Sequence, residues 1–201
     1  MNRSVELFFD FGSPASYLAS TQLPRIAAEC GAQIAWRPML LGGVFKATGN
    51  ASPIAVAAKG RWMLGDLARW ARRYGVPFVF NPNFPLNTLT LMRGAIAVQM
   101  QQPQDLPRYI EAIYRGAWVE ARNLGDSEVV AQQIAAAGLD APRILAATAD
   151  AAVKSALIAA TEEAVARGVF GAPTCFVGSE MFFGQDRLEF VREALLQPLP
   201  A

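Results

Sequence analysis

The feature that most constrains this chain is an apolar strand that runs straight into a serine turn at the start of a helix. Residues 5–11 are mostly apolar, and Gly12-Ser13-Pro14 follows them directly. Gly12 allows a tight bend, while Ser13 is a good helix N-cap and Pro14 suits the first helical position. Backbone N–H groups and the positive end of the helix dipole would then face the Ser13 hydroxyl. The turn predicts a place for an anion such as a thiolate, and the alternative is a plain helix cap.

A second signal lies near the other end of the chain. Phe170-Gly171-Ala172-Pro173-Thr174 comes just before a predicted strand at residues 174–177. An early strand–turn–helix and a late Pro-Thr before a strand together predict a thioredoxin-like fold. A redox protein of that fold would carry Cys-x-x-Cys at the turn, but Ser13 stands there instead. We therefore expect a thiol site whose thiol is borrowed from a ligand.

Composition excludes several kinds of chemistry. The 201 residues are 53% hydrophobic, which is enough for one domain or for a domain with a large insertion. The net charge is +1 without a long basic run, so we expect no nucleic-acid partner. The chain has no histidine, which removes the commonest general base and the commonest metal ligand. We therefore predict no metal site and no Ser-His-Asp mechanism.

The cysteines and the hydropathy pattern concern the compartment. Cys30 and Cys175 lack Cys-x-x-Cys spacing and cationic neighbours in sequence, so buried structural thiols are expected. Met1-Asn2-Arg3-Ser4 passes directly into a strand, without the pattern of an export signal. No uninterrupted run of about 18 apolar residues occurs, so no membrane span is expected. These observations together predict a cytoplasmic protein.

The order of predicted elements divides the chain into three parts. Residues 4–40 are predicted as strand, helix, strand, and residues 161–201 as helix, strand, strand, helix. We expect these two parts to form one thioredoxin-like domain with a mixed sheet. Residues 41–160 would form an inserted all-helical subdomain. Within it, the predicted helices cover residues 53–75, 87–101, 105–118, 126–137 and 141–160.

Motifs along nearly the whole length resemble one family. The chain is similar to the 2-hydroxychromene-2-carboxylate isomerases, relatives of the kappa-class glutathione transferases within the DsbA-like thioredoxin superfamily. Each motif is weak alone, but their order and spacing along the chain are specific. They are Asp10-Phe11-Gly12-Ser13-Pro14-Ala15-Ser16-Tyr17-Leu18, Arg37-Pro38-Met39-Leu40-Leu41-Gly42-Gly43, Ala47-Thr48-Gly49-Asn50, Lys59-Gly60, Asp66-Leu67-Ala68-Arg69-Trp70-Ala71, Phe84-Pro85-Leu86-Asn87-Thr88, Val169-Phe170-Gly171-Ala172-Pro173-Thr174 and Phe183-Gly184-Gln185-Asp186-Arg187-Leu188.

The resemblance implies a fold and a cofactor. The fold is α/β, a thioredoxin-like mixed sheet with a large inserted all-helical subdomain in the DsbA and kappa-class arrangement. The implied cofactor is glutathione, with Ser13 as the catalytic residue that hydrogen-bonds the sulfur and favours the thiolate. The resemblance also implies a cis peptide bond between Ala172 and Pro173, whose backbone would pair with the cysteinyl part of glutathione. From sequence alone, a trans proline at a strand's first residue is the commoner arrangement.

Four further residues are implied in glutathione binding. Gln185 and Asp186 would hold the γ-glutamyl end, although helix capping is the alternative for Asp186. Kappa-class relatives usually show Ser-Asp there, so a hydroxyl contact would be absent with Gln185. Lys59 would pair with the glycyl carboxylate, or it is an ordinary solvated lysine. Asn50 would contact either glutathione or the substrate carboxylate, and a simple turn residue is the alternative.

The resemblance also implies a substrate and a reaction. Phe45, Asn50 and Asn87 are candidate substrate-binding residues, although Asn87 is also a possible N-cap. Trp62, Arg69 and Phe84 are weaker candidates, since most aromatic residues at helical spacing belong to a core. The implied activity is the interconversion of 2-hydroxychromene-2-carboxylate and trans-o-hydroxybenzylidenepyruvate by a homodimer. The alternatives are a kappa-like glutathione transferase or peroxidase, a non-catalytic glutathione-binding module and, least of all, a thiol–disulfide oxidoreductase.

Overall fold

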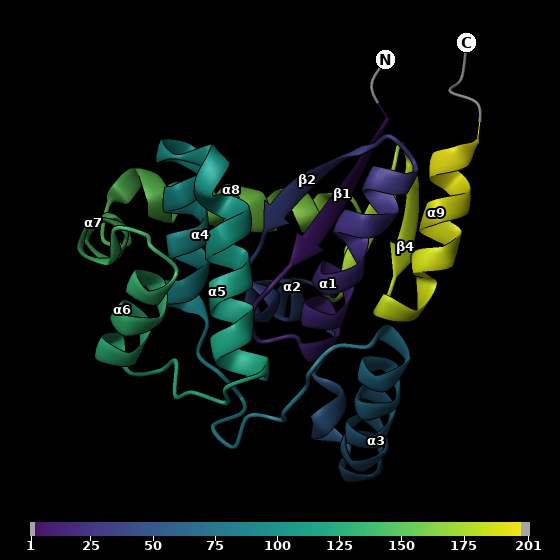
Figure 1. The fold of residues 1–201 in the computed structure, drawn as a ribbon, viewed down its shortest axis with the longest axis horizontal. Helices are drawn as coiled ribbons and strands as arrows, with labels where there is room; N and C mark the ends of the chain where they lie inside the picture. Colours follow the sequence, from purple (N-terminus) through teal and green to yellow (C-terminus); the bar gives the residue numbers. More distant parts are fainter. Residues whose placement is uncertain (1–2, 198–201) are drawn as a thin grey trace.

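A four-stranded mixed sheet forms the centre of the molecule (Figure 1). The computed structural model describes residues 3–197. The strand order is β2-β1-β3-β4, with β1 parallel to β2 and antiparallel to β3, and β4 antiparallel to β3. The strands are β1 (Ser4–Phe9), β2 (Gln33–Pro38), β3 (Thr174–Val177) and β4 (Glu180–Phe183). The fold is thus thioredoxin-like, and the first and last parts of the chain meet in one sheet as the sequence predicts.

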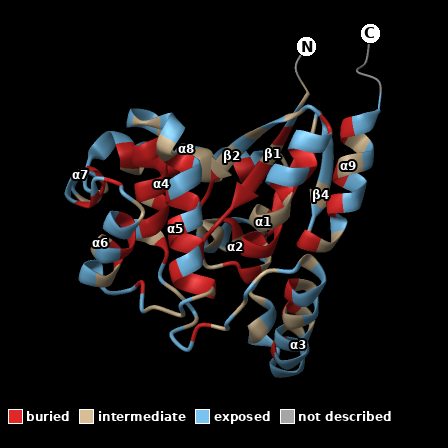
Figure 2. Ribbon diagram, in the orientation of Figure 1, coloured by how far each residue is buried: buried red, intermediate tan, exposed pale blue. Residues whose placement is uncertain are grey.

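Helices cover both faces of this sheet because β1 buries apolar side chains on both sides. Val5, Leu7 and Phe9 belong to the main core with α1 (Pro14–Glu29) and α9 (Leu188–Leu196). Phe8 points the other way, into a smaller core with Met39 and Val44. Figure 2 shows this buried centre with exposed outer helix faces. Alternation along β1 therefore fixes which elements flank the site.

The segment between β2 and β3 is all-helical, as the sequence predicts. It packs around α4 and α5, whose inward faces are buried (Figure 2). The predicted boundary after residue 160 falls inside α8, and the division into two structural units stays a prediction. The helices are α2 (Leu41–Thr48), α3 (Ala57–Tyr74), α4 (Leu89–Gln101), α5 (Leu106–Trp118), α6 (Ser127–Ala136), α7 (Ala141–Ala147) and α8 (Ala151–Ala166), with 3-10 turns at Pro53–Ala55, Pro103–Asp105 and Gln185–Arg187.

The sequence prediction places one break between helices at the wrong position. The sequence predicts a helix over 141–160 and a further helix at the start of residues 161–201, but in the structure α7 ends at Ala147 and α8 begins at Ala151. The Thr148 hydroxyl donates back to the Leu145 carbonyl, and Asp150 takes an extended conformation before the new helix. At the predicted break, α8 continues through Thr161, whose hydroxyl donates to the Leu157 carbonyl at 2.8 Å. Neither feature involves a glycine or a proline.

Two other boundaries differ from the predicted ones. β1 ends at Phe9 rather than at Phe11, because the Asp10 carboxyl accepts a hydrogen bond from the Gly12 N–H and starts the turn early. The helix predicted over residues 53–75 is a 3-10 turn followed by α3. Helix α2 was not predicted.

Within residues 3–197, no single helix is long and apolar enough to cross a bilayer. The pair α7 and α8, bent by 71°, has the length and composition only when both helices are taken together.

Candidate functional site

Ser13 stands where the two ends of the chain meet. It is the N-cap of α1, and its hydroxyl oxygen accepts a hydrogen bond from the Ser16 N–H at 3.1 Å. The same hydroxyl donates to the Ala172 carbonyl at 2.9 Å, across 159 residues of sequence. The side chain is buried, with 5% of its surface exposed. Capping and a contact with the opposite segment thus occur together, so the two interpretations of Ser13 do not exclude each other.

The segment opposite Ser13 has the geometry that the resemblance implies. The peptide bond between Ala172 and Pro173 is cis. The Pro173 carbonyl accepts from the Gly184 N–H at 3.0 Å, which holds the segment against the end of β4. The Ala172 N–H donates no hydrogen bond to any residue in the described range. One backbone donor therefore remains beside the Ser13 hydroxyl for an extended peptide ligand.

Beneath the Ser13 turn lies a buried carboxyl that the sequence analysis did not single out. Asp10 is 1% exposed, and its two oxygens accept from the Gly12 N–H and the Leu41 N–H, each at 2.8 Å. Burial raises the pKa of Asp10, and these hydrogen bonds, with one from Thr88, partly offset the effect. In the sequence, Asp10 opens the first motif that carries the family resemblance, but no role was predicted for it.

Gln185 and Asp186 lie in the 3-10 turn that precedes α9. Gln185 is buried, and its carbonyl accepts from the Tyr74 hydroxyl at 2.5 Å. The Asp186 carboxylate pairs with Arg187 at 2.8 Å, and no side-chain cap is formed at the start of α9. The structure therefore shows no capping bond from Asp186. Burial, followed by the nearby Asp186 charge, raises the pKa of Tyr74 to about 12, so its phenol keeps its proton at neutral pH.

Asn50 and Lys59 differ in how firmly they are held. The Asn50 amide donates to the Phe170 carbonyl at 2.8 Å, which ties the loop after α2 to the segment just before Ala172. Its side-chain oxygen accepts from the Ala51 N–H at 2.8 Å. Lys59 lies exposed in the first turn of α3 and belongs to no ion pair among residues 3–197. Asn50 is thus held at the edge of the site, whereas no hydrogen bond or ion pair of the described residues holds the Lys59 side chain there.

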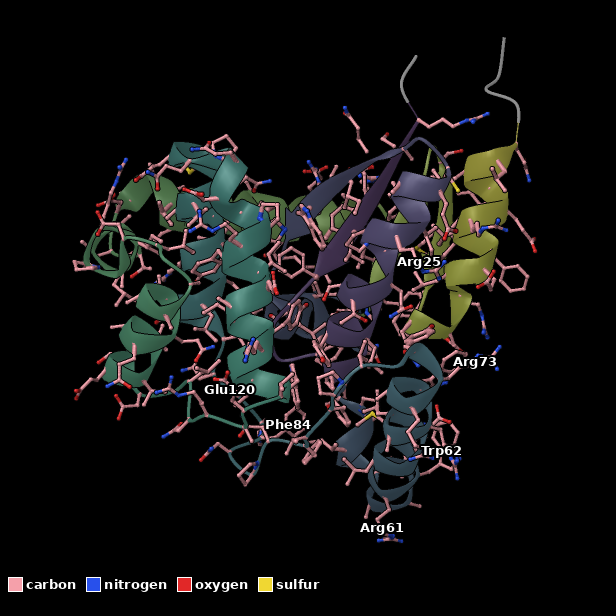
Figure 3. All side chains as sticks on the ribbon, in the orientation of Figure 1. Arg25, Arg61, Trp62, Arg73, Phe84 and Glu120 are labelled. Carbon is pink, nitrogen blue, oxygen red and sulfur yellow. The ribbon has the colours of Figure 1, made fainter. Side chains whose placement is uncertain are left out.

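The candidate substrate-binding residues differ in their exposure and in their contacts. Phe45 is half-buried on α2, and Asn87 is exposed, with its side chain accepting from the Leu89 N–H at 3.2 Å. Phe84 packs against Phe80 and Trp118, so it belongs to the core. The weaker candidates Trp62 and Arg69 are exposed on α3, and Trp62 projects away from the body of the molecule (Figure 3). The structure gives no support to a pocket built from these last three side chains.

Other features of the described chain lie apart from this site. A cavity of about 530 Å³ opens between α1 and α5, lined in part by Tyr17, Trp36 and Tyr114, and it includes none of the predicted site residues. Both cysteines are buried and free. Burial raises the pKa of Cys175 to about 12. In residues 3–197, no group of three or more potential metal ligands was found.

Fold and site together define a thioredoxin-like protein with a serine where the nucleophilic cysteine would stand. Residues 4–196 match the DSBA-like thioredoxin domain. The chain is 32% identical to the 2-hydroxychromene-2-carboxylate isomerase of Sphingobium xenophagum, covering 98% of this chain and 100% of that protein. It is 29% identical to glutathione S-transferase kappa 1 of Rattus norvegicus, covering 98% and 95%.

Solved structures give the same result. A structure of 2-hydroxychromene-2-carboxylate isomerase superposes with a TM-score of 0.87 at 30% identity, covering 96% of this chain and 94% of that one. A probable DsbA oxidoreductase from Streptomyces coelicolor, at 21% identity and a TM-score of 0.76, shares the fold. The chain therefore belongs to the 2-hydroxychromene-2-carboxylate isomerase family, within the DSBA-like thioredoxin domains.

Proposed function

We propose that this protein is a cytoplasmic, glutathione-dependent isomerase that interconverts 2-hydroxychromene-2-carboxylate and trans-o-hydroxybenzylidenepyruvate. The observation that carries the proposal is the Ser13 hydroxyl, buried at a helix N-terminus and 2.9 Å from the carbonyl beside a cis proline. The relatives named as isomerases support the reaction class. We further propose a homodimer and a small aromatic carboxylate as substrate.

The residues at the site fit glutathione as a ligand. A thiolate sulfur needs a hydrogen-bond donor and a positive potential, and the Ser13 hydroxyl and the start of α1 offer both. The cysteinyl amides need an exposed strand-like partner, and the free Ala172 N–H offers it. The Ser13 hydroxyl donates to the Ala172 carbonyl, so on binding the thiolate it would exchange a neutral hydrogen bond for a charge-assisted one.

Each remaining residue would have a limited task. Glutathione, when bound, supplies a sulfur nucleophile that adds reversibly to the conjugated carbon and is regenerated. Ser13 would hold the sulfur in its anionic form and aim it. Asp186 and the Gln185 backbone would receive the γ-glutamyl end, and Lys59 the glycyl carboxylate. Asn50, Phe45 and Asn87 would face the aromatic carboxylate, so that two reactants are held in register.

A second candidate is a kappa-like glutathione transferase or peroxidase. The similarity to the rat kappa 1 enzyme favours it, because the identity of 29% is close to that of the isomerases. A non-catalytic glutathione-binding module would use the same contacts without turnover. A thiol–disulfide oxidoreductase fits least, since Ser13 occupies the nucleophile position and both cysteines are buried.

Product analysis separates these functions. The protein is incubated with glutathione and, in parallel, a chromene carboxylate and an aryl halide, while substrate and free thiol are followed together. We expect the chromene carboxylate to be converted with no net loss of thiol. Stoichiometric thiol consumption with the aryl halide alone would replace the isomerase by the transferase. Tight glutathione binding without either reaction would leave a binding module.

A further inference from the structure

The Asp10 carboxyl joins three segments of the chain at one buried point. Oδ1 accepts from the Gly12 N–H in the Ser13 turn, and Oδ2 accepts from the Leu41 N–H at the start of α2, both at 2.8 Å. Thr88, the N-cap residue of α4, packs against the same point: its methyl carbon and Asp10 Oδ1 each lie 3.3 Å from where a Cβ on Gly12 would be, and its hydroxyl helps to lower the pKa of the carboxyl. No ion pair of residues 3–197 includes Asp10, so hydrogen bonds alone satisfy it.

These three segments carry the two sides of the proposed site. The turn carries Ser13, which would hold the sulfur. Helix α2 carries Phe45 and leads to Asn50, while the segment before Thr88 carries Asn87. The candidates on the substrate side are thus connected to the Ser13 turn through one carboxyl.

The atoms around the Asp10 carboxyl are tightly packed. A Cβ added at Gly12 would lie 3.3 Å from Asp10 Oδ1 and 3.3 Å from the Thr88 methyl carbon. Leu40, the N-cap residue of α2, makes no side-chain cap bond, so Asp10 takes that role from 31 residues away. A buried carboxyl without a cation costs free energy unless its hydrogen bonds are kept. The turn, α2 and α4 are therefore held at fixed distances.

We propose that Asp10 is a positioning residue that holds the Ser13 turn in register with α2 and α4, and so aligns sulfur with substrate. The proposal rests on the proposed function. Asp10 lies below the turn and is not among the residues that would contact glutathione. Its loss should therefore reduce turnover more than glutathione affinity.

The test compares Asp10→Asn with the wild-type protein. An asparagine keeps one carbonyl oxygen but turns an amide N–H toward one of the two backbone donors. We expect kcat to fall by about tenfold while the glutathione dissociation constant stays within about twofold. Amide exchange at Gly12 and Leu41 should become faster, and this readout does not depend on any substrate.

A matched control comes from Gln133, a buried polar residue that joins α6 to α5. Its amide donates to the Ala112 carbonyl at 3.0 Å and its oxygen accepts from Arg122 at 3.0 Å. Gln133→Met should lower the melting temperature and leave kcat unchanged. If the wild-type protein converts no substrate, the proposed function fails, and the exchange at Gly12 and Leu41 still decides whether Asp10 positions the turn.

A second pair of variants tests the proposal if the Asp10→Asn protein does not fold. Thr88→Val keeps the shape and removes the donor, whereas Thr88→Ser keeps the hydroxyl. We expect Thr88→Val to lower kcat at unchanged glutathione affinity, and Thr88→Ser to restore it. A folded Asp10→Asn or Thr88→Val protein with wild-type kcat and unchanged exchange at Gly12 and Leu41 overturns the proposal.

Discussion

At the scale of single residues, the Ser13 hydroxyl makes two hydrogen bonds that have different roles. It accepts from the Ser16 N–H as a helix cap and donates to the Ala172 carbonyl across the site. Ser13→Ala removes both. A variant at this position must therefore be compared with one that loses only a cap.

Ser13→Ala should abolish most turnover while glutathione still binds. Removing the donor to sulfur should raise the thiol pKa of bound glutathione and lower kcat by about 10- to 100-fold, since one charge-assisted bond is lost. Losing the cap should cost about 1 kcal/mol of stability. Thiolate absorbance titrated against pH, beside a thermal melt, measures both effects.

Asp140→Ala is the matched control for that cap loss. The Asp140 side chain accepts from the Arg143 N–H at 3.1 Å, the same spacing and length as in Ser13, at the distant start of α7. It should lose similar stability and keep full activity. An unchanged thiol pKa and full activity in Ser13→Ala would remove Ser13 from the proposed mechanism.

The two cysteines should be dispensable. Cys175 is buried and its pKa is raised to about 12, so it stays a protonated, unreactive thiol at neutral pH. The double variant Cys30→Ala, Cys175→Ala should keep glutathione-dependent turnover and lose about 1–2 kcal/mol of stability through smaller side chains in the core. Loss of turnover in the folded double variant would favour the oxidoreductase alternative.

At the scale of elements, the residues proposed to bind the charged ends of glutathione lie at the start of α3 and just before α9. Lys59 lies in the first turn of α3, and Asp186 lies just before α9. Tyr74 at the other end of α3 donates to the Gln185 carbonyl, so these two elements are joined directly. The proposed contact of Asp186 with the γ-glutamyl end of glutathione thus lies beside this junction.

Lys59→Ala should raise the glutathione dissociation constant by a few-fold. The side chain is exposed, so its ion pair with the glycyl carboxylate should contribute no more than about 1 kcal/mol and should weaken with added salt. Calorimetric titration at two salt concentrations measures this, with Lys154→Ala on α8 as the control. A dissociation constant equal to that of the wild-type protein at low salt would leave Lys59 a solvated lysine.

Asp186→Ala tests the other end of the same ligand. We expect weaker glutathione binding with little change in melting temperature, because no cap bond from Asp186 is present and its partner Arg187 is half exposed. The losses at Lys59 and Asp186 should be nearly additive, since the two residues share no partner. A lower melting temperature with unchanged affinity would make Asp186 a structural residue only.

The sequence predicted those elements whose causes are local. The four strands and the start of α1 follow from alternation and from Ser13-Pro14, which act within a few residues. Helix α2 was missed because its two glycines weaken the pattern and its cap comes from Asp10, 31 residues away. The break before Asp150 was missed because no glycine or proline marks it. The role of Asp10 was missed for a related reason, since its partner Leu41 is 31 residues away in the sequence.

At the scale of the whole molecule, an ion-pair network connects the sheet to the end of α8. Glu6 on β1 accepts two hydrogen bonds from Arg167, at 2.7 and 3.0 Å, and Arg37 on β2 lies 3.3 Å away. The hydrogen bond from Arg167 is the main reason that the pKa of Glu6 is lowered from 4.5. The Arg167 guanidinium also lies over the Phe176 ring on β3.

Glu6 should make the protein less stable in acid. Because its pKa is lower in the folded state, its contribution is fully present above pH 4.5 and is lost as the pH falls through the lowered value. Glu6→Gln should cost about 1 kcal/mol at neutral pH and flatten the stability curve below pH 4.5, since the pair is partly exposed. Urea unfolding between pH 3 and 7 measures this, with the exposed Glu162→Gln as control. A curve parallel to that of the wild-type protein would contradict it.

The sheet order has a consequence for how the protein is made. β1 pairs with β2, which is nearby in the sequence, but its other neighbour is β3. Leu7 can therefore pair with Cys175 only after the segment between them has been made. Contacts between such distant segments close slowly, because a long loop must be ordered before they form. During synthesis β1 would leave the ribosome well before β3 and would stay unpaired on one edge until residues 174–177 have followed. Ser13 would likewise meet Ala172 only then, so a nascent chain would acquire its ligand site only after the helical segment between them has been made.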